Sequence, residues 1–164
     1  MNTAEDTYFD VGTNAGYYAL LAHQKGAKVH AFKPFPSTFK LLRNNCEGKN
    51  IMAWNLAVSD DNQGVRMRKD SRYPDFSGRN AVSTDGNIAV ASTSLDQFGI
   101  VPTVIKIDVE GHEMAVLHGA KHLLKKYKPK LIVESQEGTD FLFSLGYTQV
   151  RLLGSVRATN YLYT

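Results

Sequence analysis

The sequence contains a single cysteine, Cys46, among its 164 residues. One cysteine excludes a disulfide bond within the chain, and we expect a reducing compartment, the cytoplasm. Long apolar runs are also absent, because none approaches the roughly 20 residues that a membrane-spanning helix needs. We therefore expect no membrane segment.

An excess of charge of one sign is missing too. The formal net charge is only +3, and the basic residues are dispersed. The densest group is Lys125, Lys126, Lys128 and Lys130, which lies where a predicted helix ends before Pro129. Cations at a helix C-terminus complement the helix dipole. This group therefore favours a solvated helix end, and we predict no nucleic-acid partner.

The chain length fits one domain, residues 1–164. Short apolar runs bounded by breakers predict strands at residues 8–11, 29–32, 52–56, 104–107 and 131–133. Helical patterns lie between or after them, at residues 16–24, 37–45, 114–126 and 139–145. Ser37, just after Pro36, has the position of an N-cap. This alternation predicts an α/β fold with a doubly wound parallel sheet covered by helices on both faces.

The tail and one internal segment depart from the alternation. Residues 148–153 and 160–163 predict an antiparallel hairpin at one edge of the sheet, with its turn at Gly154 and Ser155. Residues 59–94 are polar and rich in serine, asparagine and aspartate, with strand patterns at 65–68 and 88–90. Segments of this length are functional lids or disordered. We expect a short extra strand with a loop over the site, and disorder fits the composition equally well.

The motif Asp10-Val-Gly-Thr-Asn-Ala-Gly16 is the first candidate for a binding site. It joins a predicted strand to a predicted helix, so it places bare backbone at the carboxyl end of a strand, where open α/β sheets bind ligands. Gly12 and Gly16 would let a ligand approach the main chain without a Cβ in the way. A pair of glycines at this spacing is equally typical of an ordinary tight turn.

Acidic residues follow two other predicted strands. Asp108 and Glu110 come after the strand at 104–107, with His112 and Glu113 beyond them, and Glu134 ends the strand at 131–133. The carboxyl ends of parallel strands meet at one edge, so we expect these groups in the same crevice as Gly12. Asp108 and Glu113 have a simpler alternative, in which they cap the next helix and favour its first turn.

These segments together resemble the FkbM-type methyltransferases. The matching motifs are the one at residues 10–16, Ala-Phe-Lys-Pro (31–34), Asn-Leu-Ala-Val-Ser-Asp (55–60), Ser-Leu-Asp (94–96), Ile-Lys-Ile-Asp-Val-Glu-Gly-His-Glu (105–113), Gly-Ala (119–120), Pro-Lys-Leu-Ile-Val-Glu (129–134) and Leu-Gly-Tyr (145–147). The resemblance implies a class I, Rossmann-like fold: a mostly parallel seven-stranded sheet with an antiparallel C-terminal strand. It also implies an S-adenosylmethionine-dependent enzyme that methylates a hydroxyl of a small molecule or glycan.

Family members usually carry further helical sequence before the glycine motif, whereas nine residues precede Asp10 here. Apolar surface left uncovered in this way would be buried in a homodimer. The cofactor-binding positions that the resemblance implies are Asp10, Gly12, Asn14, Gly16, Lys33, Phe35, Asn55, Ala57 and Asp108. Asn55 and Ala57 match positions near the adenine, while Phe35 fits either a place against the ring or one in the core.

Methyl transfer requires an aligned acceptor oxygen that is deprotonated or polarised. The candidates for the general base are Glu110, His112 and Glu134. His112 has the suitable ordinary pKa, although a lone histidine is more often a surface or capping residue. A magnesium ion held by Asp108, Glu110 and Glu134 is a further alternative, but carboxylates beside a sulfonium already have a partner, and we predict no metal.

Lys33 departs from the family pattern. That position is normally a glutamate whose carboxylate accepts hydrogen bonds from both ribose hydroxyls, and an ammonium group has no acceptor capacity. Three interpretations remain open. Cofactor binding survives with lower affinity, by about ten- to a hundred-fold. Lys33 meets the phosphate of an NADP-type ligand. Or the chain is a catalytically silent binding protein that has lost the cofactor.

Overall fold

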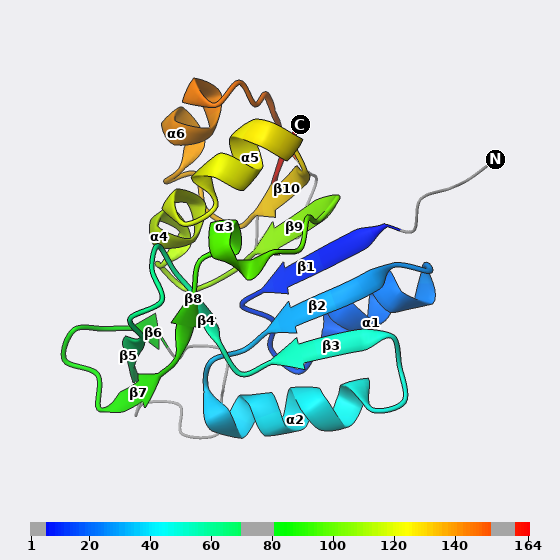
Figure 1. Cartoon of the computed structure of the whole chain (residues 1–164), viewed down its shortest axis with the longest axis vertical. Coiled ribbons are helices and arrows are strands. Elements are labelled where there is room, and N and C mark those ends of the chain that lie inside the picture. The colour runs from blue at the N-terminus through cyan, green and yellow to red at the C-terminus, as the bar shows by residue number, and fades with distance from the viewer. Residues whose placement is uncertain (1–5, 70–80, 152–159) are drawn as a thin grey trace.

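The computed structural model describes residues 6–69, 81–151 and 160–164, and its centre is one seven-stranded sheet (Figure 1). Its strands are β1 (Thr7–Val11), β2 (Lys28–Phe32), β3 (Ile51–Trp54), β9 (Val104–Ile107), β10 (Lys130–Val133), β11 (Gln149–Arg151) and β12 (Tyr161–Tyr163). Their order across the sheet is β11-β12-β10-β9-β1-β2-β3. The five strands from β10 to β3 are parallel, and β12 is antiparallel to both of its neighbours. The predicted mostly parallel sheet with an antiparallel C-terminal strand is confirmed.

Helices cover both faces of the sheet, as predicted. They are α1 (Tyr17–Gln24), α2 (Pro36–Cys46), α3 (Leu95–Phe98), α4 (Glu113–His118), α5 (Lys121–Tyr127) and α6 (Thr139–Ser144). In Figure 1, α1 lies behind β2 and β3, while α3 and α5 lie in front of the sheet. No helix in the described part of the chain is long and apolar enough to cross a membrane.

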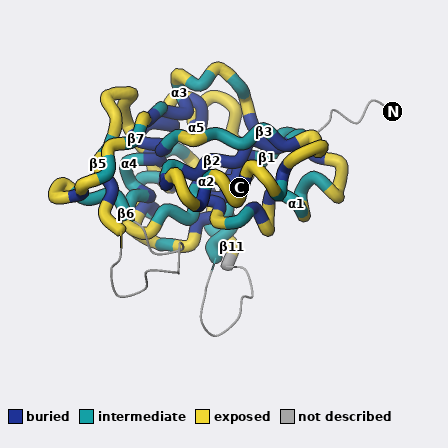
Figure 2. Tube along the Cα trace, turned by 90° about the horizontal axis from the view of Figure 1, so that it is seen from below, coloured by how far each residue is buried: buried dark blue, intermediate teal, exposed yellow. Residues whose placement is uncertain are grey.

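The alternation of side chains along the strands produces two separate cores. Phe9 and Val11 of β1 point to the face that α3, α4 and α5 cover, and they join the larger core. Val29 and Ala31 of β2 point to the opposite face, where Leu42 of α2 completes the smaller core. Figure 2 shows the buried positions following the central strands. Asp10, between Phe9 and Val11, therefore points to the face of the smaller core.

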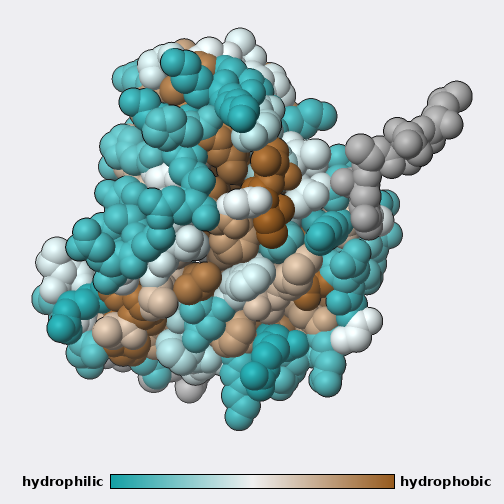
Figure 3. All heavy atoms as spheres, in the orientation of Figure 1, coloured by the Kyte–Doolittle hydropathy of each residue, from teal (hydrophilic) through white to brown (hydrophobic). Residues whose placement is uncertain are grey.

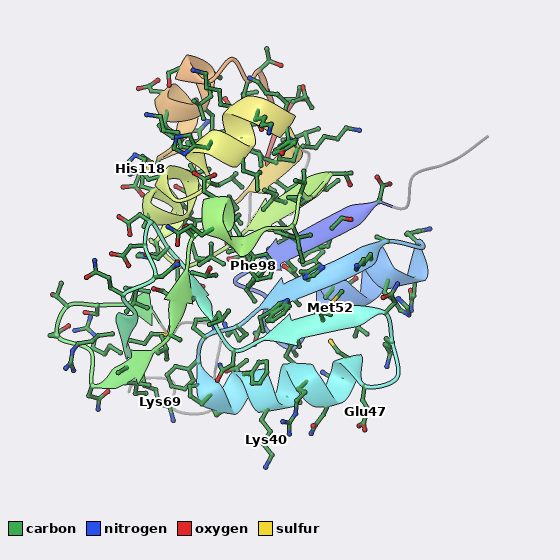
Figure 4. The ribbon with its side chains drawn as sticks, viewed as in Figure 1. Lys40, Glu47, Met52, Lys69, Phe98 and His118 are labelled. Atoms are coloured by element: carbon green, nitrogen blue, oxygen red, sulfur yellow. The ribbon has the colours of Figure 1, made fainter. Side chains whose placement is uncertain are left out.

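An aromatic cluster closes the front of the sheet. Phe98 lies over β1 and β2 (Figure 4), and its ring is 5.1–5.8 Å from the rings of Phe9, His30, Phe32 and Trp54. Apolar residues form a band across the middle of this face (Figure 3). The cluster packs α3 onto β1, β2 and β3.

Two helix predictions need correction. Ser37 is not an N-cap, because α2 already begins at Pro36 with Phe35 as its N-cap residue, and proline at the first helical position suits the helix dihedral. The helix predicted over 114–126 is two helices, α4 and α5, with Gly119 between them. A Cβ on Gly119 would lie 2.0 Å from the carbonyl oxygen of Ser59, so the chain passes very close to another segment there.

Residues 57–93 contain more strands than predicted. The strand patterns at 65–68 and 88–90 are confirmed as β5 (Val65–Arg68) and β7 (Ile88–Val90), which form an antiparallel sheet with β6 (Ala81–Val82). In addition, β4 (Ala57–Val58) pairs with β8 (Ser92–Thr93). Figure 1 shows the short strands β4 to β8 beyond the carboxyl ends of the parallel strands of the large sheet. The predicted hairpin at the tail is also confirmed as β11 and β12, and its turn lies outside the described residues.

Candidate functional site

A cavity of about 260 Å³ opens at the carboxyl ends of β1, β2, β9 and β10. Its walls come from the loops after these strands, from α1, and from β4, β5 and β6. The lining residues are Asp10, Val11, Gly12, Thr13, Asn14, Tyr17, Tyr18, Phe32, Lys33, Pro34, Leu56, Ala57, Val58, Met67, Val82, Lys106, Asp108, Val109, Glu110, His112 and Glu134. Ligand sites in open α/β folds occupy this position.

Most of the residues predicted for the site line this cavity. They are Asp10, Gly12, Asn14, Lys33, Ala57, Asp108, Glu110, His112 and Glu134. Gly16, Phe35 and Asn55 do not. Phe35 is buried at the start of α2, and a Cβ on Gly16 would lie 2.9 Å from Leu42 of the same helix. Gly16 therefore allows α1 and α2 to approach one another. Phe35 lies in the core, which is the second of the two locations that the sequence allowed for it.

Gly12 brings the ends of two strands together. Its φ is +89°, and a Cβ there would lie 1.8 Å from the carbonyl oxygen of Asp108. The backbone N–H of Asp108 donates to the carbonyl of Val11, 3.0 Å away. Only glycine fits this conformation and this spacing together. The loops after β1 and β9 can therefore form one wall of the cavity.

Asp10 and Lys106 are neighbours across β1 and β9 in the same register. Both side chains are buried, Asp10 to 1% exposure and Lys106 to 4%. Neither carboxylate oxygen of Asp10 has a hydrogen bond of good geometry among the described residues, although the Thr13 hydroxyl and the Ala19 N–H are close enough to lower its pKa. Burial raises the pKa of Asp10, and the Lys106 ammonium opposes that rise. A buried acceptor of this kind at a cavity wall suits a ligand that brings a donor or a positive charge.

Lys106 also makes an ion pair within the cavity. Its Nζ lies 2.7 Å from Oδ2 of Asp108 and 4.9 Å from the ring centre of Tyr18. Burial would raise the pKa of Asp108, but a hydrogen bond from Glu134 and the Lys106 charge outweigh it and hold that pKa below its ordinary value. The same hydrogen bond, together with burial, raises the pKa of Glu134 to about 7. Near neutral pH Glu134 is therefore partly protonated, and its protonated form donates to Asp108.

The Lys33 ammonium group interacts electrostatically with the carboxylates of the cavity. The residue is 6% exposed, and burial lowers the pKa of its ammonium group against the attraction of Asp108 and Glu110. Asn55 holds the loop that carries Lys33, because its Nδ2 donates to the carbonyls of Lys33 and Pro34 at 2.9 and 2.8 Å. Asn55 thus supports the wall of the cavity from outside it.

The loop after β9 has a strained backbone. Glu110 has φ +53°, which is uncommon for a residue with a side chain. Oε1 of Glu113, a buried carboxylate, accepts hydrogen bonds from the N–H groups of Val109 and Gly111 at 3.3 and 3.4 Å. These bonds fix the loop on both sides of Glu110. Strain held in this way is concentrated at functional sites.

His112 is held by a short chain of hydrogen bonds. Its Nε2 lies 3.0 Å from Oγ of Ser59, and that hydroxyl donates to Oδ1 of Asp60, also 3.0 Å away. Burial lowers the pKa of His112, while the carboxylates of Asp60 and Glu113 oppose the fall. The imidazole is therefore mostly neutral at pH 7 and can accept a proton.

Sequence reasoning did not identify several lining residues. Lys106 is the most important, and its signal was visible, because a lysine between Ile105 and Ile107 interrupts an apolar strand. Met67 and Val82 reach the cavity from β5 and β6, which no local pattern could assign to it. Tyr18 lies over Lys106 only because α1 packs beside β1.

Comparison with known proteins identifies this architecture. The family model for the methyltransferase FkbM domain matches residues 10–159. The chain belongs to the FkbM methyltransferase family. The hexuronic acid methyltransferase AglP of Haloferax volcanii is 32% identical over 143 residues, which cover 83% of this chain and 58% of AglP. The 31-O-demethyl-FK506 methyltransferase FkbM of Streptomyces tacrolimicus is 39% identical over 74 residues, or 43% of this chain and 27% of that protein.

Solved structures share the fold of this chain. An FkbM methyltransferase from Methylobacillus flagellatus has a TM-score of 0.72 with 19% identity, covering 97% of this chain and 43% of that one. Fibrillarin of Aeropyrum pernix, crystallised with S-adenosylmethionine, has a TM-score of 0.59 with 12% identity over 96% of this chain and 65% of its own. At these identities the likeness shows the fold, a class I methyltransferase fold. The FkbM-family chain described here spans about half the length of these FkbM-type relatives.

The cavity of this FkbM-family chain fits the methionine part of S-adenosylmethionine by its charges. Four carboxyl groups face two lysines, and the buried oxygens of Asp10 offer acceptors to an ammonium group. The ribose part fits less well, since Lys33 offers only donors. In the described part of the chain, no three histidine, cysteine or acidic side chains are arranged to hold a metal ion. The magnesium alternative therefore gains no support from the geometry.

Proposed function

We propose that this protein is an S-adenosylmethionine-dependent O-methyltransferase that acts on a hydroxyl of a small molecule or sugar. The observation that supports it most is the buried Asp10 carboxylate at the wall of a net acidic cavity, in a chain of the FkbM family. The cofactor carries a sulfonium and an ammonium against one carboxylate, so its net charge complements that cavity. The relatives named for a hexuronic acid and for demethyl-FK506 support the class of acceptor.

The predicted residues that line the cavity have separate tasks in this proposal. Asp10, Asn14 and Asp108 hold the ammonium and carboxylate of the methionine part, and Gly12 and Ala57 leave room for the cofactor. When bound, S-adenosylmethionine supplies a methyl carbon that takes the electron pair of the acceptor oxygen while the carbon–sulfur pair returns to sulfur. The chain itself must align that oxygen and remove its proton, which accounts for most of what such enzymes contribute.

Among the three candidate bases, His112 suits the task best. Its lowered pKa keeps the imidazole neutral at pH 7, whereas Glu134 is partly protonated and then donates to Asp108. Glu110 attracts the Lys33 ammonium electrostatically, which suits a binding role better than that of the base. We assign Glu110 and Glu134 to binding the acceptor hydroxyls.

Titration calorimetry tests the function. We expect heat on titration with S-adenosylmethionine and with S-adenosylhomocysteine, and no heat at millimolar ligand would rule the enzyme out in favour of a silent binding protein. Lys33→Glu restores acceptors for the ribose hydroxyls and is expected to tighten binding about ten-fold or more. Lys40→Glu is the matched control, because Lys40 points into solvent from α2 (Figure 4). If NADPH binds instead and Lys33→Glu abolishes that binding, Lys33 holds a phosphate.

The proposal extends to the assembly and the compartment. Tyr17, Tyr18 and Leu21 of α1 are 72%, 45% and 42% exposed, and a homodimer would bury this surface beside the cavity. The free, buried Cys46 agrees with a reducing compartment, the cytoplasm. Analytical ultracentrifugation of wild type and of a Tyr17→Ser, Leu21→Ser variant tests the dimer. A monomeric wild type at 100 µM or so, far above ordinary dimer dissociation constants, would refute it.

A further inference from the structure

Ser59 and Asp60 lie outside the cavity, yet they contact a residue of its wall. Ser59 is 2% exposed, and its backbone N–H donates to the carbonyl of Thr93, 2.9 Å away. Its position is therefore fixed by the pairing of β4 with β8. From this position Oγ of Ser59 reaches Nε2 of His112 at 3.0 Å and Oδ1 of Asp60 at 3.0 Å.

The direction of these two hydrogen bonds follows from counting protons. An ionised aspartate accepts hydrogen bonds and donates none, so the single hydroxyl proton of Ser59 must point to Asp60. Oγ of Ser59 is then an acceptor towards His112, and Nε2 must carry the proton. A neutral imidazole has one N–H, so its Nδ1 is left unprotonated.

We propose that Ser59 and Asp60 are positioning residues that fix the tautomer of His112, so that Nδ1 takes the proton of the acceptor hydroxyl. This inference rests on the proposed function and adds two residues to it. In the step, the O–H bond of the acceptor breaks, its proton goes to Nδ1, and the electron pair stays on oxygen as the nucleophile. The imidazolium that results carries protons on both nitrogens, and Nε2–H continues to donate to Ser59.

Asp60 has a second effect in this arrangement. Its carboxylate stabilises the imidazolium through the Ser59 hydroxyl, in the way that a buried aspartate orients and stabilises the histidine of hydrolytic triads. Among the described residues, Asp60 and Glu113 are the charged groups that act on His112, and both favour its protonated form. Removal of the Asp60 charge must therefore lower the pKa of His112, because only Glu113 then opposes the effect of burial.

Nitrogen NMR of the imidazole rings tests the tautomer without cofactor or acceptor. We expect the uniformly ¹⁵N-labelled wild type to show His112 with a protonated Nε2 and a bare Nδ1, and His112→Gln identifies its signals among the five histidines. Ser59→Ala is expected to shift the signals towards a mixture of tautomers, and Ser59→Thr, which keeps the hydroxyl, is expected to restore them. A protonated Nδ1 in the wild type would overturn the inference.

Kinetics test the consequence for catalysis. Removal of a general base costs about 10²- to 10⁴-fold, which is the loss of kcat that we expect for His112→Gln. Ser59→Ala is expected to lower kcat by about ten-fold, a smaller loss than the base itself, with recovery in Ser59→Thr and little change in the KM of the cofactor. Ser37→Ala, at an exposed position on α2, is the matched control.

Asp60→Asn keeps the size of an exposed side chain and is expected to fold even if Ser59→Ala does not. We expect it to move the acid limb of the kcat–pH profile to lower pH, since its His112 loses a proton more readily. An unchanged limb, or equal losses in Ser59→Ala and Ser59→Thr, would contradict the inference. If no acceptor is methylated at all, the proposed function fails, and the NMR spectra still decide the tautomer.

Discussion

Glu113 accepts a hydrogen bond from the backbone N–H of Gly111, and the same oxygen accepts one from Val109. Between the two donors lies Glu110, whose φ of +53° would be costly without such support. Glu113→Ala leaves two N–H groups without this acceptor, and we expect it to lower the free energy of unfolding by about 1–3 kcal/mol. Urea denaturation measures this loss.

The same variant tells whether Glu113 acts on function only through Glu110. If it does, Glu113→Ala will lower kcat in the wild-type background and have little further effect in a Glu110→Ala background. Additive losses in the double variant would mean that the two hydrogen bonds of Glu113 position another residue of the loop, such as His112. Acceptor KM and kcat, measured at saturating cofactor, distinguish the two cases.

Gly12→Ala should destabilise the protein far more than Gly26→Ala. Both glycines have φ near +90°, but a Cβ on Gly26 has nothing within 4 Å, whereas one on Gly12 would overlap the carbonyl of Asp108. The backbone strain common to both costs about 1–2 kcal/mol, and the clash adds to it at Gly12. We expect the two unfolding free energies to differ by at least about 2 kcal/mol. Equal losses would mean that the loops after β1 and β9 can separate.

Binding of a cationic ligand should depend on the protonation of Glu134. Glu134 has a pKa of about 7, so the cavity becomes more negative as pH rises from 6 to 8. We expect the affinity for S-adenosylmethionine to increase over this range, while that for S-adenosylhomocysteine, which has no sulfonium, changes less. Calorimetry at three pH values measures both. Glu134→Gln should remove the difference between the pH dependences of the two affinities. If that difference persists in the variant, another group causes it.

His30 should make the fold sensitive to acid. Its ring is buried, Nδ1 accepts a hydrogen bond from Trp54 Nε1 at 3.1 Å, and burial lowers its pKa to about 4. Above pH 6.5 the ring is neutral in both folded and unfolded chains, and stability is complete. As pH falls from 6.5 to 4, only the unfolded chain gains the proton, so about 3 kcal/mol is lost.

Urea denaturation at pH 7, 5.5 and 4.5 measures this loss. His30→Phe should flatten the part of the pH dependence that comes from this ring, although it also removes the acceptor of Trp54. His118→Gln, at an exposed position on α4, is the control and should keep the wild-type slope. A slope that is the same in all three proteins would show that His30 is not the group responsible.

The sequence predicted which strand ends form the site, because the signal for each strand end is local. Apolar runs that end in Asp10, Asp108 and Glu134 indicated buried strands, and parallel strands end at one edge of the sheet. Nine of the twelve predicted residues therefore line the cavity. Gly16 and Asn55 do not line the cavity, because each contacts a segment distant in the sequence. Gly16 lies against Leu42, and Asn55 donates to the carbonyls of Lys33 and Pro34.

The sequence by itself determined the order of the main strands and helices, the mostly parallel sheet and the family, since each follows from periodicity, breakers and local motifs. Only the tertiary structure decided how the charges of the cavity are paired. Lys106 meets Asp108, protonated Glu134 donates to the same carboxylate, and Ser59 reaches His112 across 53 residues of chain. The physical reason is that a pKa and a tautomer depend on distances of about 3 Å between side chains. Such distances are set by how the strands pack against one another, which no local pattern records.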